Sequence, residues 1–468
     1  MKRGIKLKFT VLNGSPKGNE SVSLHYILYI QKKHPEHEYK VYNVAQKIKR
    51  LEKDSSKLHE VLEDIKSSDG VIWSFPVYVM LICSQFKRFI ELIFENSAES
   101  YFKDKYTVAL STSIHFYDHT ANNYIHSICD DLGMKYVDYF AADSWDLLYP
   151  DRRKKWLIFM EAFFKAIENN EPTVKYYKPL EYRDFTYEPQ ELSIYGDKID
   201  TKGKKVLILS EDTSNDSNLG KMVNFLKNVF SNNVELVNIH DINMAGPCIG
   251  CVRCGYNHEC VYKDKDGFTD FWNNKVLKTD ILIFAGNIKD RYLSSRWKMI
   301  FDRSFFNNHV PTLMNKQIGY IISGPFSQIP NLKEMFTAQA ELQRANIVNF
   351  ISDEFGDSKY ISSLLYILAK KAVEFSRNNF VKMHTFLGEG GMKIFRDDIY
   401  GRNRFVFLAD HEWYEKHGVY DTFPQNDERA KKMNEKLIPL MKIDKVRNKI
   451  NMVQEFLRPF KKLIEKVE

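Results

Sequence analysis

Near the start of the chain, Lys6-Leu-Lys-Phe-Thr-Val-Leu12 runs directly into Asn13-Gly-Ser-Pro-Lys-Gly-Asn-Glu-Ser21. The first stretch alternates and is rich in strand formers, the second breaks the strand, and the apolar period over 22–30 predicts a helix. A strand, a small polar loop and a helix direct backbone amides and a helix N-terminus toward a phosphate. The alternative is an ordinary turn with an N-cap serine. Side chains that suit a phosphate contact are Ser15, Lys17, Asn19, Ser21 and Ser23.

Strand-like segments recur along the first third of the chain, with helical segments between them. The expected strands lie at 39–44, 70–74, 106–111 and 135–140, and a last helix covers about 152–168. Five strands alternating with helices predict an α/β fold with a doubly wound parallel sheet. Ligands of such sheets bind at the carboxyl ends of the strands, so the loops after the first, third and fourth strands should line one site.

Those loops carry a family resemblance. The 13–21 loop, Phe75-Pro-Val-Tyr78 and Ser84-Gln-Phe-Lys-Arg-Phe-Ile90 resemble the NADPH-dependent FMN reductase family, which has a flavodoxin-like fold. The resemblance implies that FMN binds here. It assigns the FMN phosphate to Ser15, Lys17, Asn19 and Ser21, and the isoalloxazine ring to Pro76, Val77, Tyr78, Ser111, Thr112, Ser113 and His115. Plain packing is the alternative role for Tyr78 and His115.

The same pattern occurs twice. Ser84–Glu91 aligns with Ser295–Asp302 at an offset of 211, which the fifth strands share, whereas the second strands differ by 195. Sixteen extra residues therefore lie between the second and third strands of the later copy. We expect two tandem flavodoxin-like domains with five-stranded sheets and a mainly helical extension. The expected boundaries are 1–170 for the FMN domain, 171–203 for a linker, 204–378 for a degenerate second domain and 379–468 for the extension.

Four of the six cysteines fall in the inserted stretch, Cys248-Ile-Gly-Cys251-Val-Arg-Cys254-Gly-Tyr-Asn-His-Glu-Cys260. Crowded thiols serve metal binding better than packing, and the spacing favours a [4Fe–4S] cluster. A zinc site is the second interpretation and a free-thiol or disulfide loop is the third. The two remaining cysteines, Cys83 and Cys129, are expected to be buried as small hydrophobic residues.

The cysteine spacing also resembles that of iron–sulfur flavoproteins, in which a cluster approaches the FMN of a neighbouring subunit. The resemblance assigns the metal to Cys248, Cys251, Cys254 and Cys260.

In the second copy, the loop at 210–217 carries three acids and no lysine, and carboxylates there would repel a phosphate. Asn287-Ile-Lys289 stands where the first copy has Pro76-Val-Tyr78. The second domain is therefore expected to have lost FMN.

The net charge of +7 is confined to the end of the chain. Residues 429–468 hold twelve Lys or Arg and five acids, an excess of seven that equals the charge of the whole chain. A neutral body argues against a nucleic-acid partner. No segment has the pattern of a signal peptide or a membrane span, and six cysteines do not make a disulfide scaffold, so we expect a cytoplasmic protein.

Two features of the extension carry further expectations. The glycine-rich segment 385–398 is expected to form a turn packed on the body. Farther on, an apolar stripe at four–three spacing predicts a basic amphipathic helix that Pro459 kinks or divides. The helix is expected to pack on its own protein, with peripheral membrane contact or an acidic partner as the alternatives. The stripe consists of Val446, Ile450, Val453, Leu457, Phe460, Ile464 and Val467.

The leading functional hypothesis is an FMN-dependent oxidoreductase whose iron–sulfur cluster relays electrons to or from the flavin. One alternative is an NAD(P)H-dependent reductase of flavin, quinones or nitro compounds without a cluster, and another is a non-catalytic redox sensor. The expected partners are a small-molecule or protein electron donor and acceptor, with NAD(P)H a possible donor and an oligomer possible. No catalytic triad or carboxylate pair stands out, and Asp118 and His119 beside His115 suit loop hydrogen bonding better than proton delivery.

Overall fold

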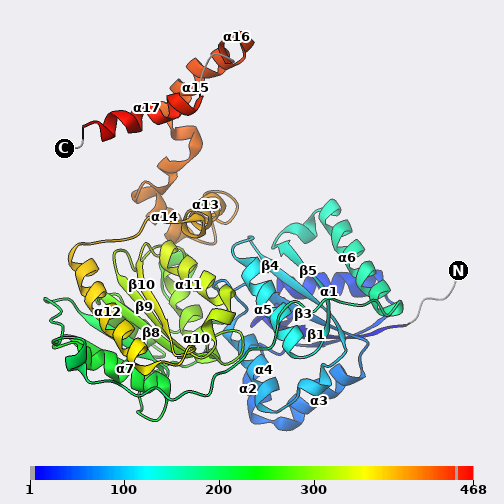
Figure 1. Cartoon of the computed structure of the whole chain (residues 1–468). Helices are drawn as coiled ribbons and strands as arrows, with labels where there is room; N and C mark the ends of the chain where they lie inside the picture. The colour runs from blue at the N-terminus through cyan, green and yellow to red at the C-terminus, as the bar shows by residue number, and fades with distance from the viewer. Residues whose placement is uncertain (1–5, 448–451, 467–468) are drawn as a thin grey trace. The chain divides into compact units, whose positions relative to one another are not determined.

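The computed structural model describes residues 6–447 and 452–466. Its first half is a parallel five-stranded sheet in the order β2-β1-β3-β4-β5, with helices on both faces (Figure 1). The strands are β1 (Lys8–Asn13), β2 (Glu38–Tyr42), β3 (Gly70–Pro76), β4 (Tyr106–Ser113) and β5 (Lys135–Asp143). The helices are α1 (Val22–Lys33), α2 (Ile48–Lys53), α3 (Ser55–Ser67), α4 (Ser84–Glu95), α5 (Asp118–Asp131) and α6 (Pro150–Glu168).

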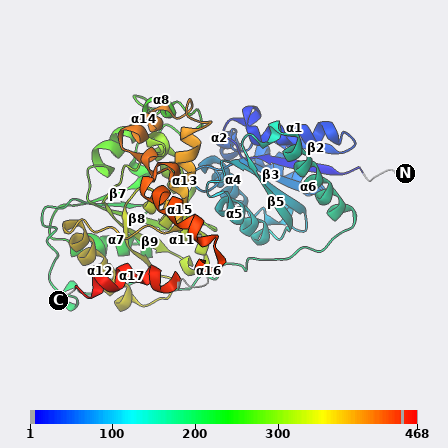
Figure 2. The same cartoon turned by 90° about the horizontal axis from the view of Figure 1, so that it is seen from above.

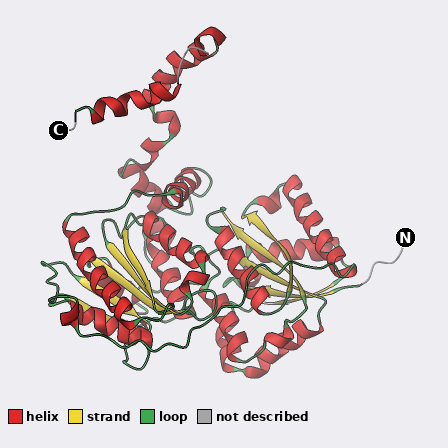
Figure 3. Cartoon of the chain, viewed as in Figure 1, coloured by secondary structure: helices red, strands yellow, loops and turns green. Residues whose placement is uncertain are grey.

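The second half repeats this sheet. Its order from one edge is β7-β6-β8-β9-β10, which is the order of the first sheet, and the two sheets are separate (Figures 2 and 3). The strands are β6 (Val206–Ser210), β7 (Val234–Asn238), β8 (Ile281–Asn287), β9 (Gln317–Ser323) and β10 (Asn346–Ser352). The helices are α7 (Asn218–Val229), α8 (Cys254–Asn257), α9 (Phe268–Phe271), α10 (Ser295–Ser304), α11 (Pro330–Leu342) and α12 (Ser358–Arg377). The predicted fold class is confirmed.

The strands of the first sheet extend farther than their apolar residues suggest. Phe75 and Pro76 pair with Ser111 and Thr112, so β3 and β4 include residues that the sequence assigns to loops. Proline is tolerated there because it stands at the last position of its strand. The polar residues still lie at the carboxyl edge of the sheet, where ligands of doubly wound folds bind.

A tight turn follows β1 because α4 lies directly over it. A Cβ atom on Gly14 would stand 2.1 Å from the ring of Phe86. Phe86 is fully buried and packs in one core with Trp73 and Phe75. The glycine directly after β1 is therefore required by packing. Cys83, just before α4, and Cys129 of α5 are also fully buried, as expected.

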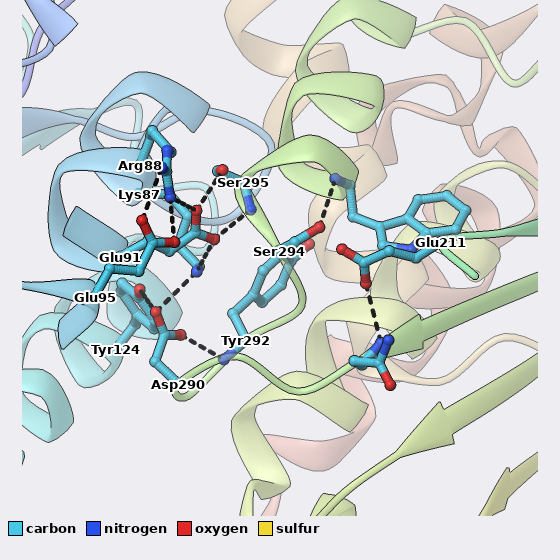
Figure 4. Close-up of polar contacts among 12 residues, drawn as sticks. Lys87, Arg88, Glu91, Glu95, Tyr124, Glu211, Asp290, Tyr292, Ser294 and Ser295 are labelled. Carbon is cyan, nitrogen blue, oxygen red and sulfur yellow. Dashed lines mark hydrogen bonds and ion pairs between the residues drawn. The ribbon is translucent and has the colours of Figure 1, made fainter. Parts of the chain in front are cut away.

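The two halves meet through α4 and α10, and the contact is reciprocal. The backbone N–H of Ser84, at the start of α4, donates to Asp302 of α10 at 2.7 Å. The N–H of Ser295, at the start of α10, donates to Glu91 of α4 at 2.6 Å (Figure 4). Each acid thus satisfies a free amide in the first turn of the other half's helix.

A buried lysine accompanies each acid. Lys87 lies 2.9 Å from Glu91 and 2.8 Å from Asp290, and all three side chains are buried (Figure 4). In α10, Lys298 forms the matching ion pair with Asp302, and both side chains are fully buried. Ser84, Lys87 and Glu91 correspond to Ser295, Lys298 and Asp302 at the offset of 211, so the interface repeats the symmetry of the fold.

The glycine-rich segment of the extension is a helix, not the expected turn. Helix α13 (Phe386–Tyr400) packs on α11 at very short range. A Cβ on Gly388 would stand 2.7 Å from the Glu341 side chain, and one on Gly391 would stand 2.9 Å from Leu342. The glycines therefore remove side chains at a close helix–helix contact. Glu341 also accepts hydrogen bonds from the backbone N–H groups of Thr385 and Gly388 at the start of this helix, which offsets the low helix propensity of glycine.

Residues up to Asp410 form one compact unit, and residues from His411 form a second. The remaining helices are α14 (Leu408–Lys416), α15 (Glu428–Met441), α16 (Asp444–Arg447) and α17 (Met452–Ile464). Of the two expected effects of Pro459, a kink or a division, the division does not occur, because α17 continues through this proline. Ile450 and Val467 of the predicted stripe lie outside the described residues. Among the residues that the structure describes, no helix is long and apolar enough to cross a bilayer.

The reciprocal contact predicts a specific acid sensitivity. Burial alone would raise the pKa of Glu91, but the charge of Lys87 and the hydrogen bonds from Ser295 lower it to about 2. A depression from 4.5 to about 2 contributes roughly 3 kcal/mol of stability above pH 5, which is lost as the pH falls toward 2. We expect Glu91→Gln to lower the free energy of unfolding by that amount at pH 7, measured by urea denaturation.

Glu95→Gln is the matched control for this prediction. Glu95 lies on the same helix but is exposed and pairs with Arg88 at 2.6 Å, so its loss should cost about 0–1 kcal/mol. The difference between wild type and Glu91→Gln should shrink steadily between pH 4.5 and 2. Equal effects of the two substitutions, or a difference that does not change with pH, would contradict the assigned role of Glu91.

Candidate functional site

One cavity of about 580 Å³ is lined by the carboxyl-edge loops of the first half and by the cysteine loop of the second. This volume is in the usual range for a cofactor or small-molecule site. Eight of the eleven residues predicted to bind FMN line it, namely Ser15, Lys17, Ser21, Pro76, Val77, Tyr78, Thr112 and Ser113. All four predicted metal ligands, Cys248, Cys251, Cys254 and Cys260, line the same cavity.

The other three predicted FMN residues do not line this cavity. Asn19 is exposed and accepts a hydrogen bond from Asn43 at 2.7 Å. Ser111 is buried, and its hydroxyl accepts from Asn122 at 2.9 Å. His115 Nδ1 lies 2.8 Å from the carboxylate of Asp118, which raises the pKa of the imidazole above its usual value. These three residues make hydrogen bonds within the first half.

The loop after β1 has the geometry of an anion site. Gly18 adopts a φ of +58°, and its N–H donates to the Ser15 carbonyl at 3.1 Å. The Ser21 hydroxyl caps α1 by accepting from the backbone N–H of Leu24 at 3.3 Å. Lys17 forms no ion pair with any residue that the structure describes. An uncompensated cation and a helix N-terminus together favour a phosphate group.

The turn after β3 is held in an unusual backbone conformation. Val79 and Met80 both have positive φ, at 40° and 64°, which is an outlier for a β-branched residue such as valine. The N–H of Tyr78 donates to the Leu81 carbonyl at 2.6 Å, and the Thr120 hydroxyl donates to the Met80 carbonyl at 2.6 Å. Such strain persists only where the surrounding structure enforces it, and it is typical of ligand sites. The turn presents Tyr78 to the cavity.

The cysteine loop contacts this turn directly. Gly250 has a φ of +67°, and a Cβ there would stand 1.9 Å from the Tyr78 hydroxyl and 3.3 Å from Lys17. The side-chain amide of Gln85 donates to the Cys248 carbonyl at 2.8 Å, and the Lys298 ammonium donates to the Tyr78 carbonyl at 2.9 Å. Two hydrogen bonds and one close packing contact therefore join the two halves around the loop and the turn.

The four thiols are not gathered as closely as the ligands of a bound zinc ion. In the described part of the chain, no three of these sulfurs lie within 4.8 Å of one another. A tetrahedral zinc with bonds of about 2.3 Å would hold its sulfurs about 3.8 Å apart. In a cluster each thiolate binds a different iron, so its sulfurs are farther apart. Burial raises the pKa of Cys248 and of Cys254 to about 12, so metal binding must displace their protons.

Hydrogen-bond donors near the thiols lack acceptors. Three residues that line the cavity carry buried nitrogen atoms without a partner among the described residues: Trp272 Nε1, Arg303 Nε and Asn307 Nδ2. Hydrogen bonds to the sulfurs are a recurrent feature of iron–sulfur sites, where they tune the reduction potential. The donor set therefore fits a sulfur-rich group. The Arg303 charge is balanced by Asp266 at 2.9 Å.

The extension completes the site with residues that no sequence motif marks. Asp410 is fully buried and lies 2.8 Å from His258 Nε2 and 2.7 Å from His309 Nδ1. Burial opposes ionisation, but these two histidines hold the pKa of Asp410 below its usual value. Asn308, next to His309, donates to the Cys254 carbonyl at 2.8 Å. No sequence pattern connects Asp410 with His258, 152 residues away.

At the matching edge of the second sheet, acids take the place of a ligand. Asp212, at the position of Ser15, accepts from the N–H of Ser214 at 2.8 Å and from the Ser217 hydroxyl at 2.6 Å. Glu211 accepts from the N–H of Asn287 at 3.2 Å (Figure 4). The amides and hydroxyl that would contact a phosphate there are already satisfied by carboxylates.

The ring region of this second edge is also closed. Asp353 accepts from the N–H of Gly324 at 2.8 Å and from the Ser323 hydroxyl at 2.7 Å. Tyr182, from the connector between the halves, reaches within 3.6 Å of the position of a Cβ on Gly324. Gly324 corresponds to Ser113 at the offset of 211, so a tyrosine from this chain lies where the ring site of the first half would be.

Comparison with known proteins agrees with the topology of the first half. The sequence model of a family described as having a flavodoxin-like fold matches residues 8–157. The matched residues span the first sheet. The match ends before the second sheet begins. No curated protein matches the sequence of the chain.

Several solved structures resemble about a third of the chain. An NADH:FMN oxidoreductase (EMOB) is 17% identical, with 34% of this chain and 90% of that chain covered and a TM-score of 0.30. FerB, a flavoenzyme NAD(P)H:(acceptor) oxidoreductase from Paracoccus denitrificans, is 18% identical. The match covers 35% of this chain and 98% of that chain, with a TM-score of 0.29. An FMN-dependent NADH-azoreductase from Bacillus anthracis is 15% identical, with 35% of this chain and 99% of that chain covered and a TM-score of 0.26. Likenesses at this level establish no activity for this chain.

The contact between Gly250 and Tyr78 generates a prediction about stability. Gly250→Ala places a methyl group on the Tyr78 hydroxyl, so it should lower the free energy of unfolding by about 1–3 kcal/mol beyond the cost of its positive φ. Tyr78→Phe in the same chain should restore part of the loss, because the contact at 1.9 Å is removed and the nearest remaining ring atom is 3.2 Å away. Urea denaturation of both single variants and the double variant gives the coupling energy.

Gly203→Ala is the control for backbone strain. Gly203 has a φ of +82° with nothing within 4 Å, so its substitution carries the conformational cost alone, about 1–2 kcal/mol. Two outcomes would show that the cysteine loop does not pack on Tyr78. One is that Gly250→Ala and Gly203→Ala lower the free energy of unfolding equally. The other is that adding Tyr78→Phe to Gly250→Ala restores none of the lost free energy.

Proposed function

We propose that this protein is an FMN-dependent oxidoreductase with one FMN in its first half and an iron–sulfur cluster on Cys248, Cys251, Cys254 and Cys260. The observation that carries the proposal is the single cavity lined both by the FMN-type loops and by the four thiols. FMN supplies two-electron exchange with organic molecules and one-electron exchange with a metal centre. A cluster beside it would store and relay single electrons. The electron donor, NAD(P)H or a small redox protein, is left open.

The residues of the first half supply the flavin site. Lys17 and the N-terminus of α1 would neutralise the phosphate, and the Ser15 and Ser21 hydroxyls would orient it. The strained turn at Val77–Met80 would hold one side of the ring, with Thr112 and Ser113 beside it. The family match over residues 8–157 supports this assignment because it covers each of these positions.

The residues around the thiols supply the metal site. The unpartnered donors of Trp272, Arg303 and Asn307 support a sulfur-rich centre. Tyr78 and Gly250 touch where the two sites meet, so the cysteine loop lies against the turn that would hold the ring. The proposed cluster and flavin would share one cavity within a single chain.

The metal assignment predicts a composition. An anaerobic preparation should contain about four iron atoms and equivalent sulfide per chain. Cys254→Ala should lower the iron content well below four atoms per chain, because it removes one of the four thiolate ligands of the cluster, and should leave FMN content unchanged. Iron, sulfide and flavin analysis of the same samples provides the measurement.

Cys129→Ala is the matched control, since it removes a thiol that is fully buried away from the cavity. It should keep the iron content of the wild type. Wild-type protein with less than about one iron per chain, or with zinc in its place, would overturn the cluster. Turnover of NAD(P)H by such iron-free protein would support the reductase without a cluster.

The flavin assignment predicts one FMN per chain. Ser15→Asp copies the acid of the second half into the first and places a carboxylate near the phosphate. Like charges about 4 Å apart cost up to about 4 kcal/mol at a protein surface, so the Kd for FMN should rise by up to roughly 1000-fold. Quenching of FMN fluorescence during titration measures both the Kd and the stoichiometry.

Asp212→Ser is the reciprocal control. It removes one acid from the second loop while Glu211 and Asp353 continue to fill that edge, so the stoichiometry should stay at one. Two flavins bound by the wild type, or unchanged affinity in Ser15→Asp, would contradict the assignment of the site to the first half.

A further inference from the structure

Helix α17 has one apolar face and one basic face. At 100° per residue, Leu457, Phe460, Leu463 and Ile464 fall within an arc of about 120°, and Arg458, Lys461 and Lys462 lie outside that arc. A stripe of this width is what a helix presents to an apolar phase. A helix that separates its apolar side chains from Lys and Arg in this way has the composition of an interfacial helix, which lies along a membrane surface.

This apolar face is not buried within its own unit. Leu463 is 65% exposed and Ile464 is 70% exposed. Helix α15 of the same unit also exposes apolar residues, Leu437 at 46% and Ile438 at 52%. Soluble proteins rarely leave contiguous apolar surface open to water, so a patch of this kind marks an interaction site.

The charge of the same segment identifies the occupant. Residues 429–468 carry twelve Lys or Arg and five acids, while the rest of the chain is neutral. Clusters of basic residues on an amphipathic helix are attracted to anionic lipid by about 1 kcal/mol for each residue near the surface. A neutral lipid offers no such attraction. An acidic protein would pair with the charges without needing the exposed leucine and isoleucine.

We propose that the C-terminal helical segment docks the protein on the surface of an anionic lipid bilayer. Helix α17 lies in the plane of the interface, with Leu463 and Ile464 inserted at the acyl boundary and its Lys and Arg side chains on the headgroups. This mode of attachment needs no helix that spans the bilayer. This inference is independent of the proposed cofactors.

Co-sedimentation of the full chain with vesicles tests the proposal. We expect binding to vesicles of phosphatidylcholine and phosphatidylglycerol, little binding to phosphatidylcholine alone, and weaker binding as salt is raised. Leu463→Glu combined with Ile464→Glu should reduce the fraction bound to anionic vesicles by roughly ten-fold or more. Lys461→Glu with Lys462→Glu should also reduce binding, and should reduce its dependence on salt.

Val174→Glu with Met383→Glu is the matched control. These residues are 79% and 91% exposed and lie outside the segment, so the pair introduces the same charge change without touching the helix. It should lower binding far less than the Leu463 and Ile464 pair. Failure of the wild type to bind anionic vesicles, equal binding to neutral vesicles, or equal loss in the control pair would overturn the proposal. Circular dichroism of each variant verifies that the fold is retained.

Discussion

The arrangement of the two halves depends on the buried charges shared by α4 and α10. Lys87 and Lys298 are fully buried, and a buried ammonium is tolerated only when an anion is held in contact with it. Glu91 and Asp302 provide those anions, and each also accepts a backbone N–H from the other half's helix. Sliding one half against the other would leave charges and amides unpaired inside the protein. The interface therefore has one permitted register.

This register determines where the cysteine loop lies. Gln85 follows Ser84 in the interface helix and holds the Cys248 carbonyl, and Lys298 reaches from its ion pair to the Tyr78 carbonyl. The same buried contacts that join the halves also position one side of the thiol site and the turn beside it. These contacts would hold the proposed flavin and the proposed cluster at one spacing within a single chain.

Much of the fold can be predicted from the sequence. The strand pattern is a local signal, and the repeat offset follows from comparing the two halves of the sequence directly. The sequence places the ends of β3 and β4 too early, since Pro76 and Thr112 have the composition of a loop although they pair in the sheet. Gly388 and Gly391 suggest a turn because glycine disfavours helices in isolation, and only the presence of α11 explains them. The Asp410–His258 contact joins residues far apart in sequence and leaves no periodic trace.

The two copies differ where function would require it and agree where the interface requires it. At the interface, Ser84, Lys87 and Glu91 of the first copy correspond to Ser295, Lys298 and Asp302 of the second. In the loops, Ser15 is replaced by Asp212 and Tyr78 by Lys289. The lysines also differ in their second partner, since Lys87 meets the carboxylate of Asp290 and Lys298 meets a backbone carbonyl. A symmetric dimer must carry two identical sites, but a fused pair can change one copy alone. Retention of the interface with divergence of the loops is the pattern expected when one half keeps a nucleotide-type site and the other acquires the thiols.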